Sequence, residues 1–222
     1  MFSRISNKKK TEFWKDYNDH FKNKPSQQID EVRFIVFDTE TTGLDINSDR
    51  ILAIGAISIF KSKMDVGDSL EIYLKQEIFN ADSVKIHGIL KEGNTFKHTE
   101  KEAIISFLEY AKNAVLVAHQ AAYDVAMINA GIKRMGLPKI KNKVSDTGML
   151  YKKTDLCKDK TKHFSLDYLS KQFVLKKHDR HTASGDAFLT GLIFLKILSN
   201  LKKSRNLKLN DLFFNSDRRG LL

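Results

Sequence analysis

Two acidic residues, Asp38 and Glu40, lie two positions apart where an apolar run over 32–37, typical of a buried strand, ends. Side chains of a strand alternate between its two faces, so both carboxylates are expected on one side of the sheet. Like charges this close repel each other unless a cation neutralises them. Oxygen ligands suit Mg²⁺ or Mn²⁺. An isolated pair of this kind is more often two solvated carboxylates entering a turn, so the rest of the chain decides its meaning.

Two further acids and a histidine change that balance. Asp124 follows a short apolar segment, 115–118, near the start of an expected helix. Asp186 lies in the first turn or so of the last expected helix, and His181 stands five residues before it.

Three segments carry a resemblance to a known family. They are FDTETTGLD (37–45), HQAAYD (119–124) and RHTASGDA (180–187). In this order and spacing they resemble the histidine branch of the DEDD exonuclease superfamily, the DnaQ-like or DNA polymerase III epsilon-like 3′→5′ exonucleases, over about residues 32–200. The tyrosine branch would have Tyr where this chain has Thr182. The combination is far more specific than any one motif.

The resemblance implies an RNase H-like fold whose sheet edge holds two divalent cations, Mg²⁺ or Mn²⁺, between four carboxylates. It makes His181 the general base, while His178, whose offset fits neither branch, is expected to be a surface or phosphate-contacting residue. The chain departs from the family's usual pattern at Gln120, where Asn is usual, and at Tyr123, where Phe is usual; neither departure removes a ligand. The expected metal ligands are Asp38, Glu40, Asp124 and Asp186.

The chemistry explains why these residue types are needed. Hydrolysis of a phosphodiester places charge on the attacking water, on the non-bridging oxygens and on the leaving 3′ oxygen. Two cations about 3.5–4 Å apart stabilise both ends of such an in-line displacement, and carboxylates hold them. Histidine, whose ordinary pKa lies near neutrality, accepts the proton of the attacking water.

The resemblance also implies substrate contacts. Thr41, Thr42 and Leu44 follow the first motif and would hold the 3′-terminal nucleotide through backbone and apolar contacts. His87 resembles a family histidine that lies near the terminal base or phosphate. On its own, a histidine there more often serves its local turn.

The surrounding pattern predicts an α/β fold. Three strands joined by short turns, followed by alternating helix and strand, indicate a mixed sheet flanked by helices: an antiparallel meander first, then parallel strands added through crossover helices. The expected strands are 32–37, 51–60, 70–74, 115–118 and 144–146, and the expected helices are 103–111, 124–135, 166–173 and 182–201.

Composition bounds the class of protein. The 222 residues include 38 Lys and Arg against 27 Asp and Glu, a net charge of +11, which fits either a polyanionic partner or an ordinary basic background. A single cysteine excludes an intramolecular disulfide and favours a reducing, cytoplasmic location. The apolar segment 187–195 is far too short to span a bilayer, which takes about 20 residues, so no membrane partner is expected.

The chain divides into three expected parts. Residues 1–30 form a basic, aromatic N-terminal helix and linker, 31–201 the exonuclease domain, and 202–222 a basic tail that contains Leu212-Phe213-Phe214. The N-terminal helix is expected to dock on its own domain, although either end segment could also bind a polymerase or clamp. The aromatic residues of that helix are Phe13, Trp14, Tyr17 and Phe21.

The leading hypothesis is a metal-dependent 3′→5′ exonuclease. It would act on single-stranded or frayed DNA 3′ ends, release nucleoside 5′-monophosphates, and serve as a proofreading subunit of a DNA polymerase. The segment 139–181, with twelve Lys and Arg against five acids, would either line the groove for the strand or be a solvated loop. The alternatives are an exoribonuclease and, in another class, a polymerase-docking or nucleic-acid-binding subunit without catalysis.

Overall fold

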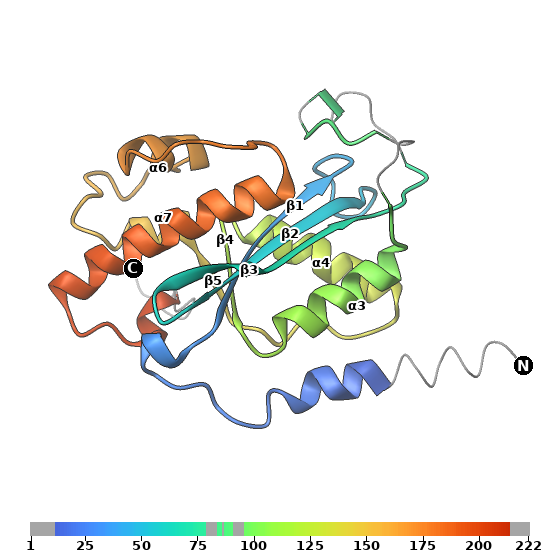
Figure 1. Cartoon of the computed structure of the whole chain (residues 1–222), viewed down its shortest axis with the longest axis horizontal. Helices are drawn as coiled ribbons and strands as arrows, with labels where there is room; N and C mark the ends of the chain where they lie inside the picture. The colour runs from blue at the N-terminus through green and yellow to red at the C-terminus, as the bar shows by residue number, and fades with distance from the viewer. Residues whose placement is uncertain (1–11, 79–83, 86, 91–95, 214–222) are drawn as a thin grey trace, which may run out of the picture.

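A five-stranded mixed sheet forms the centre of the protein, and helices cover both of its faces (Figure 1). The strand order is β3-β2-β1-β4-β5; the first three strands pair antiparallel, and β4 and β5 add in parallel beside β1. This computed structural model describes residues 12–78, 84–85, 87–90 and 96–213. The strands are β1 (Phe34–Thr41), β2 (Ile51–Phe60), β3 (Lys63–Tyr73), β4 (Val115–Ala118) and β5 (Val144–Asp146).

The helices follow the expected order with shifted ends. The last helix continues three residues past the expected end at 201, and a short helix after β5 was not expected. Residues 12–19 are also helical. The named helices are α3 (Glu100–Ala111), α4 (Ala122–Arg134), α5 (Thr147–Tyr151), α6 (Leu166–Gln172) and α7 (Ala183–Ser204), and the 3₁₀ turns are η1 (Ile29–Glu31) and η2 (Leu209–Leu212).

The alternation of β1 separates two apolar layers. Phe34 and Val36 are buried on the face that α7 covers, whereas Ile35 and Phe37 are buried on the face of α3 and α4. The strand runs to Thr41 rather than ending at residue 37, so the two acids of the first motif lie within it. By the same alternation they extend the α7 face beyond the apolar core.

The ends of the described chain pack against this domain. Tyr17, in the helix over 12–19, is buried, and its hydroxyl donates a hydrogen bond to Asn142 Oδ1 at 2.6 Å. Leu209 and Leu212 are buried in the α7 layer. Neither Tyr17 nor Leu212 is therefore free to act as a docking peptide, and Phe214 lies outside the described residues.

Candidate active site

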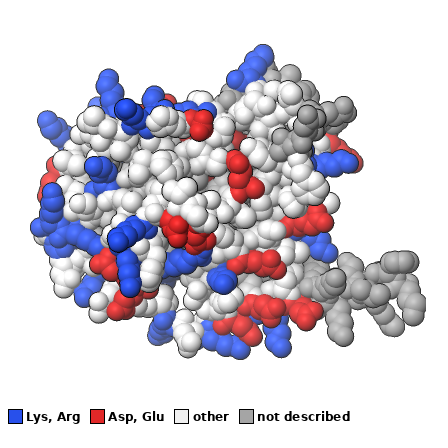
Figure 2. All heavy atoms as spheres, in the orientation of Figure 1, with Lys and Arg blue, Asp and Glu red and all other residues white. Residues whose placement is uncertain are grey.

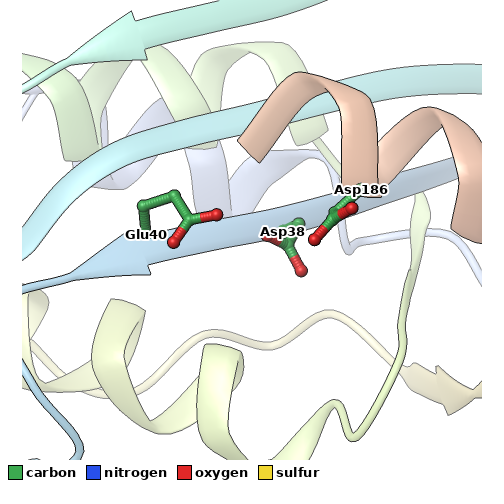
Figure 3. A group of neighbouring side chains, drawn as sticks. All are labelled: Asp38, Glu40 and Asp186. Carbon is green, nitrogen blue, oxygen red and sulfur yellow. The ribbon is translucent and has the colours of Figure 1, made fainter. Parts of the chain in front are cut away.

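Three acidic side chains converge where β1 passes the N-terminus of α7 (Figure 3). Asp38 and Glu40 project from one face of β1, and Asp186 comes from the first turn of α7. One carboxylate oxygen from each lies within 4.8 Å of the other two. Two of the three acids are 146 or more positions from the third in sequence, and the fold makes them neighbours.

A glycine in the neighbouring strand permits this approach. Gly55 of β2 is paired with Asp38, and a Cβ at that position would lie 2.2 Å from the backbone carbon of Ala183. Any larger residue would push the start of α7 away from the sheet and carry Asp186 away from Asp38. Sequence reasoning missed this residue, although an isolated glycine in a strand pattern marks close backbone approach.

Asp124 reaches the same edge from the opposite side of the sheet. It is buried at the start of α4, and its Oδ1 accepts hydrogen bonds from Thr39 N at 3.0 Å and Thr39 Oγ1 at 2.7 Å. Thr39 lies between Asp38 and Glu40 and points to the other face of β1. The fourth acid is thus anchored beside the three-carboxylate group rather than within it, and the role of Thr39 was not foreseen from the sequence.

The pKa values record how closely the acids are held. Burial raises the pKa of Asp38 well above its usual range, and the negative charges of Asp124, Asp186 and Glu40 raise it further. Burial, followed by Asp186 and Asp124, raises the pKa of Glu40 to about 8. Burial raises the pKa of Asp124 to about 7, against the lowering effect of its Thr39 hydrogen bonds. In each case the pKa rises because the buried site solvates the ionised carboxylate poorly.

This donor set fits hard divalent cations. Carboxylate oxygens are the ligands that Mg²⁺ and Mn²⁺ prefer, and a cation would offset both the burial and the mutual repulsion that raise the pKa values of Asp38 and Glu40. Asp38, Glu40 and Asp186 could share one ion. The two hydrogen bonds from Thr39 both end on Oδ1 of Asp124, so Oδ2 is the oxygen that Asp124 would offer to an ion.

The turn before α7 places one side chain inward and the next outward. The Arg180 guanidinium forms an ion pair with Asp186 and a second with Asp167 of α6, whose Oδ1 lies 3.2 Å from Nε. His181, with φ of 63°, is exposed and has no hydrogen bond to the described residues. His178 is exposed on the same loop. The contact of Arg180 with the acids was not anticipated from the sequence.

The loop after β1 is held by its hydroxyl groups. Thr41 Oγ1 donates to Gly43 O at 2.8 Å and shares a hydrogen bond with the Tyr123 hydroxyl at 2.9 Å. Thr42 Oγ1 donates to Asp49 at 2.6 Å. Leu44, at the tip, is 84% exposed. The Tyr at position 123 thus adds a tie between the start of α4 and this loop, which the usual Phe could not make.

His87 makes its contacts within its own turn. It is buried, its Nδ1 accepts a hydrogen bond from Ile89 N at 3.0 Å, and burial lowers its pKa. The hydrogen bond from Ile89 supports the local-turn interpretation, and a contact of His87 with substrate stays a prediction. Several of its neighbours in sequence lie outside the described residues.

A cavity of about 380 Å³ opens beside the α4 start. Gln120 and Tyr123 line one side, and Lys152 and His163 contribute to the other. In the view that Figure 2 draws, many Lys and Arg side chains lie on the left, where Figure 1 places α6 and the C-terminal half of α7. The cavity adjoins the residue that precedes Asp124, so a strand lying in it would pass close to the acids.

Comparison with known proteins agrees with the resemblance carried by the three motifs. The model of the RNase_T family, described as exonuclease, matches residues 35–194. The chain belongs to this exonuclease family. The chain is 37% identical over 174 residues to a DNA polymerase III PolC-type of Caldanaerobacter subterraneus, and the match covers 78% of this chain and 12% of that protein. It is 31% identical over 198 residues to DNA polymerase III subunit epsilon of Buchnera aphidicola, covering 79% and 82%.

Solved structures confirm the RNase H-like fold of this chain. Escherichia coli Exonuclease I in complex with a dA16 oligonucleotide superimposes with a TM-score of 0.67 at 15% identity, covering 78% of this chain and 42% of that one. Exonuclease X in complex with 5′ overhanging duplex DNA gives 0.59 at 20% identity, covering 79% and 95%. No helix of the described ranges is long and apolar enough to cross a membrane.

Proposed function

We propose that this protein is an exonuclease that removes nucleotides from DNA 3′ ends that are single-stranded or frayed, in the 3′→5′ direction, and releases nucleoside 5′-monophosphates with two Mg²⁺ or Mn²⁺ ions. The observation that carries the proposal is the convergence of Asp38, Glu40 and Asp186 within 4.8 Å, in a chain of an exonuclease family. Carboxylates crowded in this way repel phosphate unless cations are bound, so binding of nucleic acid alone does not account for them.

The proposed roles divide between holding charge and moving a proton. The expected ligands Asp38, Glu40, Asp124 and Asp186 would hold the two ions, and the ions, when bound, would supply stabilisation of the negative charge of the reacting phosphate. His181 accepts the proton of the attacking water. Its exposed position on a turn leaves the imidazole accessible to a strand end that reaches the acids. The hydrogen bonds of Thr39 orient Asp124 before any ion arrives.

The strand is proposed to reach the acids along the side of α4. The terminal nucleotide would rest on the 41–44 loop, where Leu44 presents an exposed apolar side chain and the backbone is pinned by Thr41 and Thr42. The preceding nucleotides would lie toward the cavity and the basic loops beyond it, where Lys152 lies at the rim. Cations at that rim hold phosphates without reading sequence.

A labelled oligonucleotide tests direction and product. A 5′-labelled single strand with Mg²⁺ or Mn²⁺ is expected to shorten stepwise from its 3′ end, and a 3′-labelled strand to release a labelled 5′-monophosphate. Asp38→Ala should lower the rate by at least about 10³-fold, since one of the converging ligands is lost. Asp155→Ala removes an exposed acid elsewhere and should leave the rate unchanged.

Two outcomes contradict the proposal. One is release of nucleotides by Asp38→Ala at the wild-type rate. The other is shortening from the 5′ end.

His181→Ala should slow cleavage strongly while binding Mn²⁺ as the wild type does, since a proton acceptor is not a ligand.

A proofreading role is proposed from the relatives, which are named as parts of DNA polymerase III. It predicts that a mispaired 3′ nucleotide on a primer–template is removed faster than a paired one, because fraying presents a single-stranded end. The same assay on a matched RNA strand measures the exoribonuclease alternative. Equal rates on paired and mispaired DNA ends, or faster cleavage of RNA, would remove this role.

A further inference from the structure

We propose that Arg180 is a resident cation of the carboxylate cluster, held there by Asp167, and that divalent metal binding at Asp186 must displace it. The inference rests on the proposed metal-binding role of Asp186 and adds a positioning residue outside the expected ligands. Its consequence is that the second ion binds more weakly than the carboxylates alone would allow.

The contacts of Arg180 show a side chain committed to this place. Its guanidinium pairs with Asp186 through Nη1 and with Asp167 through Nε, and its side chain is 17% exposed. The neighbouring Lys177 pairs with the same Asp167 at 3.1 Å but is 49% exposed. Arg180 therefore bridges the cluster and an outside carboxylate, whereas Lys177 touches only the latter.

The backbone of the turn directs Arg180 inward. Asp179 and His181, on either side of it, both have positive φ, of 50° and 63°. Asp179 O accepts hydrogen bonds from Thr182 N at 3.2 Å and Thr182 Oγ1 at 2.7 Å, which closes the turn. The turn packs so tightly on α7 that a Cβ at Gly185 would lie 2.1 Å from Asp179 O. The backbone of this turn therefore directs the Arg180 side chain toward Asp186.

Asp167 supplies the anchor. It lies in the first turn of α6, whose N-cap Ser165 accepts from Tyr168 N. Hydrogen bonds from Arg180 and Lys177 lower the pKa of Asp167 to about 2, so it stays ionised at any pH at which the protein is studied. An anionic anchor on a capped helix holds the guanidinium in register with Asp186.

The carboxylates are not equally available as a result. Asp186 is paired with Arg180 and Asp124 is bonded to Thr39, while Asp38 and Glu40 have no ion pair within the described part of the chain. An ion held through Asp38 and Glu40 alone breaks no ion pair, although the positive charge of Arg180 also acts on both carboxylates and lowers their pKa values against the effect of burial. An ion that needs a free Asp186 oxygen competes with the guanidinium, and two cations competing for one carboxylate weaken each other's binding reciprocally.

Calorimetric titration of the full chain with MnCl₂, without nucleic acid, tests the inference. Arg180→Gln should tighten the weaker Mn²⁺ dissociation constant about tenfold, within the usual range of coupling between sites. By the same reciprocity it should lower the melting temperature of the metal-free protein more than that of the Mn²⁺-saturated protein. A purely structural ion pair predicts equal losses in both states and unchanged Mn²⁺ affinity, which would overturn the inference.

Two further variants separate the contact from the net charge. Lys177→Gln removes one positive charge from the same anchor without touching Asp186, and should leave Mn²⁺ affinity within about twofold of wild type. Asp167→Asn keeps the guanidinium but removes its anchor; it should tighten Mn²⁺ binding by less than Arg180→Gln does, and add nothing in the Arg180→Gln background. A Lys177→Gln effect as large as that of Arg180→Gln, or an additive effect of Asp167→Asn, would refute the inference.

The outcome is separable from that of the proposed function. The titration reads metal binding in the absence of substrate and involves no catalytic step. A protein that binds Mn²⁺ in the expected way yet releases no nucleotide refutes the exonuclease proposal alone. If Arg180→Gln does not fold, Asp167→Asn carries the same test because it retains the guanidinium charge.

Discussion

Without metal, the carboxylate cluster is expected to lose stability as pH rises. The pKa of Glu40 is raised from its ordinary value of 4.5 to about 8, first by burial and then by the charges of Asp186 and Asp124. The folded state therefore holds a proton at Glu40 that the unfolded state releases between about pH 4.5 and 8. The stability contributed by that proton is fully present below pH 4.5 and is lost as pH rises through 8.

The size of the effect follows from the difference between the two pKa values. The interval between 4.5 and about 8 is about 3.5 pH units, and one unit corresponds to about 1.4 kcal/mol, so the upper limit is about 5 kcal/mol. Glu40 is only half-buried and its neighbours share the proton, which lowers this limit. We expect a loss of about 2–3 kcal/mol, a large part of the total stability of a domain.

Urea unfolding in EDTA between pH 5 and pH 8.5 measures this loss in the free energy of unfolding, with Glu40→Gln as the comparison. Glutamine mimics the protonated acid, so the variant should be more stable than wild type at pH 8 by about 2–3 kcal/mol and nearly equal at pH 5. The difference between the two proteins is the decisive quantity. Burial lowers the pKa of His87 and His119, and this makes stability rise with pH toward 6.5 in both proteins alike.

A difference that stays flat or moves in the opposite direction refutes the reasoning. Glu109→Gln, at an exposed glutamate of α3 on the other face of the sheet, is the matched control and should leave the pH dependence of wild type intact. Saturating Mn²⁺ should remove most of the difference in slope by replacing the proton as the neutralising charge.

Three further predictions concern the framework of the site. Gly55→Ala should lower the free energy of unfolding by about 3 kcal/mol and reduce Mn²⁺ affinity, because its Cβ would collide with the backbone of Ala183; calorimetry and urea unfolding measure both. Tyr17→Phe should cost about 1–2 kcal/mol in urea unfolding, because the buried Asn142 Oδ1 loses its donor, and leave Mn²⁺ binding unchanged. Asp146→Ala should cost about 1–2 kcal/mol and slow cleavage, because Asp146 caps α5 and accepts a hydrogen bond from the backbone at the start of α4; thermal unfolding and the labelled-strand assay test it.

Local sequence patterns predicted the elements that have a continuous apolar run or a clear capping signal. The strand over Ile51–Phe60 and the strand over Val115–Ala118 have the predicted bounds, because continuous β-branched and apolar runs between turn signals leave few alternatives. Helix α3 begins at Glu100, three residues before the apolar repeat over 103–111, because Thr99 is its N-cap and Glu102 completes a capping box. The short helix α5 has five residues and no periodic pattern, so nothing in its sequence announced it.

Contacts between distant segments account for what the sequence did not predict. The alternation of β1 predicted that Asp38 and Glu40 share one face, and the resemblance implied four converging carboxylates, of which the structure brings Asp38, Glu40 and Asp186 within 4.8 Å of one another. That Asp124 would bond to Thr39, or Arg180 to Asp186, depends on how α4 and the 179–182 turn pack on the sheet. Leu212 was predicted to belong to a possible docking peptide. It is instead buried against residues of other elements, and the sequence near Leu212 does not reveal that apolar surface.

The metal-free protein balances its crowded carboxylates in three different ways, and this links the pH prediction to the inference about Arg180. Glu40 retains a proton, Asp124 accepts two hydrogen bonds from Thr39, and Asp186 pairs with a guanidinium. A divalent cation substitutes for each of them, so metal binding should release a proton and displace a side chain at once. The net charge of +11 does not enter this balance, because the acids that bind metal are neutralised locally while the exposed lysines remain available for phosphate.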